Sequence, residues 1–302
     1  MNELRIGLIG TDTSHAVVFS SMINDIHHKD HIPGGRVVCA YAGGSADFPL
    51  SISRVDDYMN LLSDRFGILK MDSLQEVAES CDAILLESAD GRVHLEQFQA
   101  IAPYGKPVFI DKPLALSARE AAEIHQIAKR WGTPIMSSSS LRYAEQMREC
   151  LAAIGRSNVA AAETRGPFIV EPTQSVYFWY GIHSVEMLYA ILGTGCASIS
   201  AWVEDDYEIV TGRWHDGRIG TVRLERRPDS RFGAVIHGED KQRFSFEISP
   251  DAKPFYASLL EQIMNFFRTK QSPIQWSETA EIIRFLEAAE ESRKLGGVPI
   301  PT

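Results

Sequence analysis

A lysine and a carboxylate stand together at the end of a short apolar segment, and this pair could handle protons at a ligand site. Residues 108–110 are apolar and lie between Pro107 and Pro113, so they predict a short buried strand. Asp111 and Lys112 follow that strand directly. Because ligands bind at the carboxyl ends of strands in open α/β sheets, we expect Lys112 to exchange a proton with a bound substrate. A solvated surface turn would show the same spacing.

His183 is a second candidate for acid–base chemistry. The periodicity from this residue onward predicts a helix with His183 in its first turn, where the helix dipole favours a neutral imidazole. An imidazole with a reference pKa of about 6.5 is a better proton acceptor than a lysine amine of about 10.4. Tyr180 is a further candidate acid or base. The aromatic residues before His183, Trp179 among them, either wall a substrate pocket or belong to the core.

A partial phosphate-binding motif follows the predicted strand at residues 4–9. Gly10 fills the first position of G-x-G-x-x-G, while Asp12 and His15 occupy the second and third. The carboxylate of Asp12 would repel a phosphate unless it turned away, for example to cap the following helix. A dinucleotide pyrophosphate would then bind at that helix N-terminus. The hydroxyl groups that could reach the phosphates belong to Thr11, Thr13 and Ser14.

Other candidate binding residues follow other predicted strands. The acidic residue expected for the adenosine ribose is absent, and a glycine turn ending at Ser45 stands there, so the choice between NAD and NADP stays open. Ser88 and His94 follow the strand predicted at residues 83–87, although a histidine on a helix face is also typical of packing. Arg142 follows a run of serines and could hydrogen-bond a polyol or a carboxylate, as could a polar domain junction.

The elements that must position these residues change character along the chain. The first 140 residues alternate strands and helices, which predicts a doubly wound parallel sheet, the α/β fold class of a Rossmann domain. From residue 141 to 302, consecutive strands joined by short turns predict an α+β domain with a mainly antiparallel open sheet faced by helices. Close packing of the two domains would bring Lys112 and His183 to one substrate oxygen. The strands expected in the first domain are residues 4–9, 36–41, 68–70, 83–87, 108–110 and 134–138.

Composition limits the classes of partner. The formal net charge of −10 over 302 residues argues against nucleic acid and against an anionic membrane surface as partners. No signal peptide or spanning segment is visible, and the four cysteines show no CxxC spacing, so we expect a cytoplasmic protein. The nine histidines form no HxxxH or HxH pair with a carboxylate partner, so no metal site is expected.

Taken together, these features resemble the glucose-fructose oxidoreductase, inositol dehydrogenase and MocA (Gfo/Idh/MocA) family. The residues that carry the resemblance are the N-terminal strand–turn–helix, the histidine helix and the sequence Asp111-Lys112-Pro113, where the family usually has Glu-Lys-Pro. The resemblance implies NAD- or NADP-dependent oxidation or reduction of sugars, sugar derivatives or cyclitols. It matches Lys112 and His183 to the catalytic lysine and histidine. Trp179 replaces the aspartate that the family often has four residues before that histidine.

The expected site residues and partners follow from the motifs and the resemblance together. We expect catalytic roles for Lys112, His183 and Tyr180, and substrate contacts from Arg142 and Trp179. We also expect a homo-oligomer, a dimer or tetramer, formed through one face of the second sheet. The alternatives are a sensor that binds a sugar or nucleotide without turnover, and a lyase or epimerase that uses tightly held NAD. The residues expected to bind the cofactor are Gly10, Thr11, Asp12, Thr13, Ser14, His15, Ser45, Ser88, His94, Asp111 and Lys112.

Overall fold

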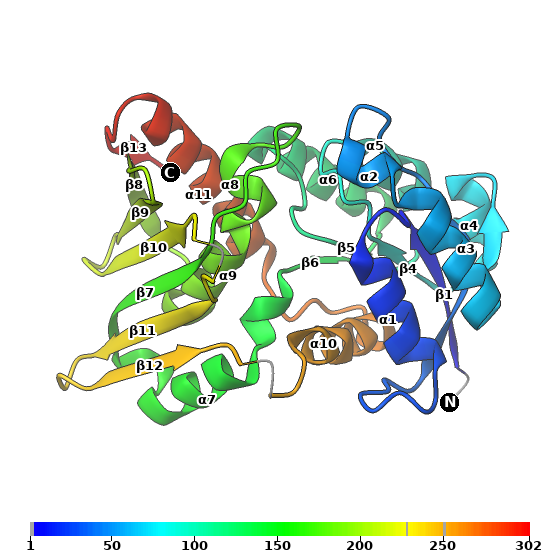
Figure 1. The fold of residues 1–302 in the computed structure, drawn as a ribbon, viewed down its shortest axis with the longest axis horizontal. Coiled ribbons are helices and arrows are strands. Elements are labelled where there is room, and N and C mark those ends of the chain that lie inside the picture. Colours follow the sequence, from blue (N-terminus) through cyan, green and yellow to red (C-terminus); the bar gives the residue numbers. More distant parts are fainter. Residues whose placement is uncertain (1–2, 228, 250–251) are drawn as a thin grey trace. The chain divides into compact units, whose positions relative to one another are not determined.

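The computed structural model describes residues 3–227, 229–249 and 252–302 (Figure 1). The chain divides into two compact units, and the first ends its main segment at Ser138. Residues 256–274 also belong to the first unit, although the sequence analysis assigned them to the second domain. Their helix packs on the start of the first sheet, where the Arg268 guanidinium donates to the Pro33 carbonyl oxygen at 3.0 Å. No local sequence pattern reports such a long-range return of the chain.

The first unit is built on a parallel sheet with strand order β3-β2-β1-β4-β5-β6 among the described residues. The sheet is of the doubly wound parallel type that the alternating pattern predicted. The order in which the chain adds strands changes direction between the neighbouring parallel strands β1 and β4. Strand β4 is buried along its whole length, as expected for a central parallel strand covered on both faces. The strands are β1 (Leu4–Ile9), β2 (Gly35–Tyr41), β3 (Leu69–Met71), β4 (Ala83–Leu86), β5 (Val108–Ile110) and β6 (Ile135–Ser137).

Helices of the first unit connect these strands by crossovers and form two layers. Helix α1 contacts α3, whereas α4 contacts α5, as the reversal of strand order requires. Ser73 caps α4, since its hydroxyl accepts from the Glu76 amide at 3.2 Å. The sequence analysis missed the short α2. The helices are α1 (Ser14–Asn24), α2 (Pro49–Ile52), α3 (Val55–Phe66), α4 (Leu74–Ser80), α5 (His94–Ile101), α6 (Ala118–Trp131) and α10 (Phe255–Thr269).

The second unit carries a sheet with strand order β12-β11-β7-β10-β9-β8-β13 among the described residues. Its pairs are antiparallel apart from β7 with β10, so the mainly antiparallel prediction is confirmed. Alternating burial along β9 places one face of the strand inward. The strands are β7 (Val159–Pro167), β8 (Cys196–Val203), β9 (Tyr207–Trp214), β10 (Ile219–Glu225), β11 (Gly233–Gly238), β12 (Arg243–Glu247) and β13 (Ile300–Pro301).

Helix α9 is the central helix of the second unit and lies against β7 and β10 (Figure 1). Every residue of α9 except His183 is buried, so the fold leaves this one side chain at the surface of its helix. Helix α11 covers β8 and contacts α9. Within the described residues, no helix has both the length and the apolar character that crossing a bilayer requires. The helices are α7 (Glu145–Ile154), α8 (Val176–Trp179), α9 (Gly181–Leu192) and α11 (Trp276–Lys294).

Candidate functional site

The turn between β1 and α1 has the geometry of an anion site. Gly10 has φ +90°, and a Cβ there would lie 2.4 Å from the Ser88 backbone nitrogen, so only glycine fits against the β4 loop. Thr13 is the N-cap of α1, and its hydroxyl accepts from the His15 amide at 3.3 Å. The expectation that Asp12 caps this helix is therefore wrong. First-turn N–H groups lack partners within their own helix, and they favour a phosphate at this terminus.

The side chains of Thr11 and Asp12 are buried in the first unit. The Asp12 carboxylate accepts from the Ser51 hydroxyl at 2.6 Å and from the Ala89 amide at 3.1 Å. Burial raises the pKa of Asp12, although these hydrogen bonds act against that rise. The Thr11 hydroxyl donates to the Val55 carbonyl oxygen at 2.9 Å. Both side chains tie loops together, and the carboxylate at the second motif position is turned away from the phosphate side.

The loop after β2 forms a hollow at the edge of the first sheet. Gly43 and Gly44 have φ values of +68° and +97°, which permit a tight turn. The Ser45 amide donates to the Ser51 hydroxyl at 2.9 Å, so the same serine holds this loop and Asp12. A cavity of about 390 Å³ opens at the ends of β2 and β3 and is lined in part by Tyr41, Gly43, Asp56, Lys70 and Asp72.

His94 and Ser88 join the loops that follow β4 and β5. The His94 ring is fully buried, and its two nitrogens lie 2.9 Å from the Pro113 carbonyl oxygen and 2.8 Å from that of Ser88. The Ser88 hydroxyl donates to the Gln97 side chain at 2.8 Å. These contacts hold the loops together at the edge of the sheet, so both residues have a structural role. Their predicted contact with a cofactor stays a prediction.

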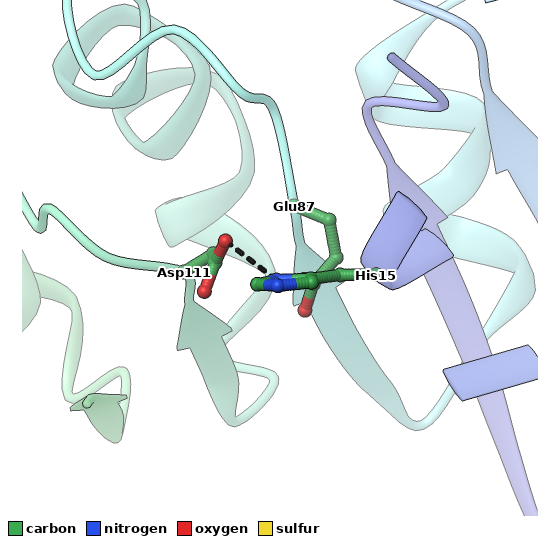
Figure 2. A group of neighbouring side chains, drawn as sticks. All are labelled: His15, Glu87 and Asp111. Carbon is green, nitrogen blue, oxygen red and sulfur yellow. Dashed lines mark hydrogen bonds and ion pairs between the residues drawn. The ribbon is translucent and has the colours of Figure 1, made fainter. Parts of the chain in front are cut away.

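Three buried side chains converge at the ends of β4 and β5 and the start of α1: Glu87, Asp111 and His15 (Figure 2). The His15 Nδ1 atom lies 2.9 Å from an Asp111 oxygen and 3.8 Å from a Glu87 oxygen. The other ring nitrogen lies 3.1 Å from the Tyr256 hydroxyl. His15, the residue at the third motif position, therefore points across the neighbouring strand ends.

The pKa values of the two carboxylates in this cluster are shifted in opposite directions. Burial raises the pKa of Glu87 well above its usual range, and the nearby Asp111 adds to that rise. Burial acts in the same direction on Asp111, but the charge and hydrogen bond of His15 outweigh it and lower its pKa to about 2. Burial lowers the pKa of Lys112, against the pull of the two carboxylates. The predicted pair of Asp111 and Lys112 thus lies in a larger charged cluster.

In the second unit, His183 packs against two aromatic side chains. Its Nδ1 atom is 2.7 Å from the Ser139 hydroxyl oxygen. The Tyr180 ring meets the imidazole edge-on with centroids 5.4 Å apart, and Phe232 does so at 5.6 Å. Tyr180 itself stacks on Phe232. The structure therefore brings two of the predicted catalytic residues, His183 and Tyr180, into contact, while Trp179 lies at the end of α8.

Arg142 is held in a buried ion pair. Its Nε donates to a Glu186 oxygen at 2.7 Å, and its Nη1 lies 2.6 Å from a Glu278 oxygen. Burial opposes the charge of Arg142, but the two carboxylates keep its pKa above the ordinary range. The Nη2 atom has no hydrogen-bond partner among the described residues. The contact of Arg142 with a substrate stays a prediction.

Several residues of these sites were not among the candidates from sequence. Glu87 had a visible signal, since it is a carboxylate directly after the apolar run 83–86. Ser139 was one hydroxyl within a run of four serines, and nothing distinguished it. Tyr256 and Phe232 gave no signal, because each is separated from its histidine by many residues.

Comparisons with known proteins agree with this fold. Residues 4–138 match the model of an oxidoreductase family with an NAD-binding Rossmann fold. A Salmonella typhimurium protein that carries the name oxidoreductase YceM is 28% identical over 155 residues, which are 51% of this chain and 45% of that protein. The match therefore spans about half of each sequence.

Solved structures resemble the chain over nearly its whole length. GenD2 from gentamicin A biosynthesis, crystallised with NAD, has a TM-score of 0.78 at 15% identity and covers 100% of this chain and 97% of its own. The apo scyllo-inositol dehydrogenase from Lactobacillus casei has a TM-score of 0.79 at 13% identity, covering 99% and 98%. At such low identity, these likenesses establish the fold of both units.

Proposed function

We propose that the chain is a Gfo/Idh/MocA oxidoreductase, because residues 4–138 match an oxidoreductase family with an NAD-binding Rossmann fold. In this proposal it transfers a hydride between NAD or NADP and a hydroxyl-bearing carbon of a sugar, sugar derivative or cyclitol. The observation that carries this proposal is the position of Lys112. Lys112 is the second residue after β5, at the edge of the sheet where ligands bind in such folds. The likeness to scyllo-inositol dehydrogenase supports the cyclitol or sugar class.

The first unit fits the phosphate groups of a dinucleotide. Gly10 lets the backbone approach closely, and the first turn of α1 offers N–H groups that have no partner within their own helix. The Asp12 carboxylate is bonded to Ser51, so it does not face a phosphate at this turn. The exposed Ser14 and the backbone of the first turn would hold the phosphates, and the hollow beside Gly43 would take the adenosine end. Bound there, the dinucleotide supplies the hydride acceptor or donor.

In this proposal, side chains of the protein transfer the proton of the substrate hydroxyl. With Nδ1 held by Ser139, the Nε2 atom of His183 exchanges that proton. The Lys112 amine orients the same oxygen and stabilises the alkoxide charge that develops on it. Tyr180, packed edge-on against the imidazole, limits the orientation of His183 and is a further proton donor.

The outer face of the second sheet supports the expectation of a homo-oligomer. Trp202 and Ile219 are each 49% exposed there. Apolar side chains grouped on one face are typical of an interface between subunits. Light scattering at micromolar concentration tests this part: a species of 33.6 kDa would contradict it. A cytoplasmic location agrees with the free thiol state of the four cysteines.

The decisive experiment is a titration of the purified chain with NADH and with NADPH, followed by turnover assays on polyols and sugars. The proposal expects saturable binding of at least one nucleotide and oxidation of a polyol by its oxidised form. No binding of either nucleotide contradicts the proposal. Binding without turnover on any polyol favours the sensor. Product that forms without net change in the cofactor favours the lyase or epimerase.

A further inference from the structure

Glu87 is a buried carboxylate without the donors that burial normally requires. Its side chain is 0% exposed, and neither of its oxygens accepts a hydrogen bond from any described residue. An unsatisfied buried polar group costs free energy, and native structures contain few of them. The carboxylate is aimed at His15, whose Nδ1 atom lies 3.8 Å away (Figure 2). A ligand with positive charge would satisfy both oxygens at this place.

The geometry points to a divalent metal ion as that ligand. One donor atom each from His15, Glu87 and Asp111 lies within 4.8 Å of the others. Donor atoms bound about 2.1 Å from an ion are separated from each other by about 3.0 to 3.4 Å. The observed separations of 2.9 and 3.8 Å from the His15 Nδ1 atom lie on either side of that range. We propose that these three side chains bind one divalent transition-metal ion.

The surroundings of His15 fit a metal ligand. Its Nε2 atom lies 3.1 Å from the Tyr256 hydroxyl, which can accept the ring proton and leave the Nδ1 lone pair directed at the two carboxylates. A partner of this kind on the second nitrogen accompanies most metal-binding histidines. The ring also stacks on Phe19 with centroids 5.4 Å apart, so its orientation is fixed by packing.

The donor set selects the class of ion. One imidazole nitrogen with two carboxylates suits Zn²⁺, Mn²⁺ or Fe²⁺, whereas Mg²⁺ and Ca²⁺ favour oxygen donors alone. Three protein donors also leave coordination positions that water or an oxygen of a bound ligand fills. The sequence could not reveal this site, because residues 15, 87 and 111 have none of the short spacings that identify metal ligands.

Metal analysis and calorimetry on the whole chain test the proposal. The chelator-treated protein is titrated with ZnCl₂ and MnCl₂ without nucleotide, so the result does not depend on the proposed redox function. We expect about one equivalent per chain, and a loss of affinity of about 100-fold or more in Glu87→Gln. Asp12→Asn is the matched control, a buried carboxylate on the same sheet edge that is already hydrogen-bonded, and it should bind as the parent does. His27→Ala with His28→Ala controls for adventitious binding to a polar loop.

X-ray absorption of the zinc-loaded parent gives a readout that needs no variant. A shell with a single imidazole and carboxylate oxygens supports the site. Two or more imidazoles, or sulfur donors, overturn it. The proposal also fails if the parent binds less than about 0.1 equivalents, if Glu87→Gln binds with unchanged affinity, or if the His27 and His28 variant abolishes binding.

Discussion

The two units differ in whether their buried ionisable side chains have hydrogen-bond partners. In the second unit, Glu208 is fully buried and accepts from the Tyr177 hydroxyl at 2.5 Å and from Arg293 at 3.0 Å. Arg142 in the same unit has a carboxylate on each side. In the first unit, Glu87 is equally buried but has no hydrogen-bond donor among the described residues. Burying a charge is costly unless it is paired. The paired charges of the second unit are therefore typical of a structural role, whereas the Glu87 carboxylate in the first unit is typical of a ligand site.

The same contrast separates neighbouring carboxylates on one sheet edge. Asp12 is satisfied by Ser51 and an amide, and it holds loops in place. Asp111 and Glu87 converge instead on His15, beside Lys112. Position at the carboxyl ends of strands therefore does not by itself make a residue functional. A carboxylate that already accepts hydrogen bonds within the fold, such as Asp12, has a structural role. One without such partners, such as Glu87, is the better candidate for binding a ligand.

Removing the proton-handling group of either unit should have the largest effect. Lys112→Ala and His183→Ala are each expected to lower turnover by about 10²–10⁴-fold while nucleotide binding is nearly unchanged. Steady-state kinetics and NADH titration measure the two quantities. If both residues act on one oxygen, the double variant loses far less than the product of the single losses. A fully active His183→Ala, or side chains more than about 10 Å apart in a closed cofactor complex, would contradict this.

Removing the paired charge of Arg142 should destabilise the fold more than neutralising Glu87, which has no hydrogen-bond donor among the described residues. Arg142→Met leaves the buried Glu186 and the partly buried Glu278 without their partner, so it should cost about 3–5 kcal/mol of unfolding free energy. Glu87→Gln breaks no hydrogen bond of the described residues and should cost less than about 1 kcal/mol in the metal-free chain. Urea denaturation of the two variants gives the comparison. Equal losses would mean that the two units do not differ in the way described.

Much of the fold could be predicted from the sequence, because its signals are local. The apolar run of β4, the cap at Ser73 and the alternation along β9 each follow from neighbouring residues. The return of α10 to the first unit and the contact of Tyr256 with His15 depend on residues far apart in the chain. Lys112 and His183 could be named as candidates because the patterns around them are local. The convergence of Glu87 on His15 could not, because it depends on residues far apart in the chain.

The titration of Asp12 should contribute to the pH dependence of the unfolding free energy. Its pKa is raised in the folded chain, so it binds a proton more tightly there than in the unfolded chain. Its contribution to stability is complete below the unfolded pKa of about 3.9 and is lost as the pH rises through the raised value. Asp12→Asn should flatten the stability curve above about pH 4, which thermal unfolding at a series of pH values measures. An unchanged slope would show that Asp12 is ionised in the folded chain at no cost.

Small effects on stability are also expected at two helix caps, Thr13 at the proposed ligand site and Ser73 away from it. Thr13→Ala and Ser73→Ala each remove a hydroxyl that accepts from a first-turn amide, and each should lower the unfolding free energy by about 0.5–2 kcal/mol. The first turn of α1 is also the proposed phosphate site, so Thr13→Ala should in addition weaken NADH or NADPH binding. Ser73 follows β3 at the end of the sheet, and its variant should bind nucleotide as the parent does. Denaturation and nucleotide titration of both variants measure this, and equal nucleotide affinity in the two would place the phosphates away from α1.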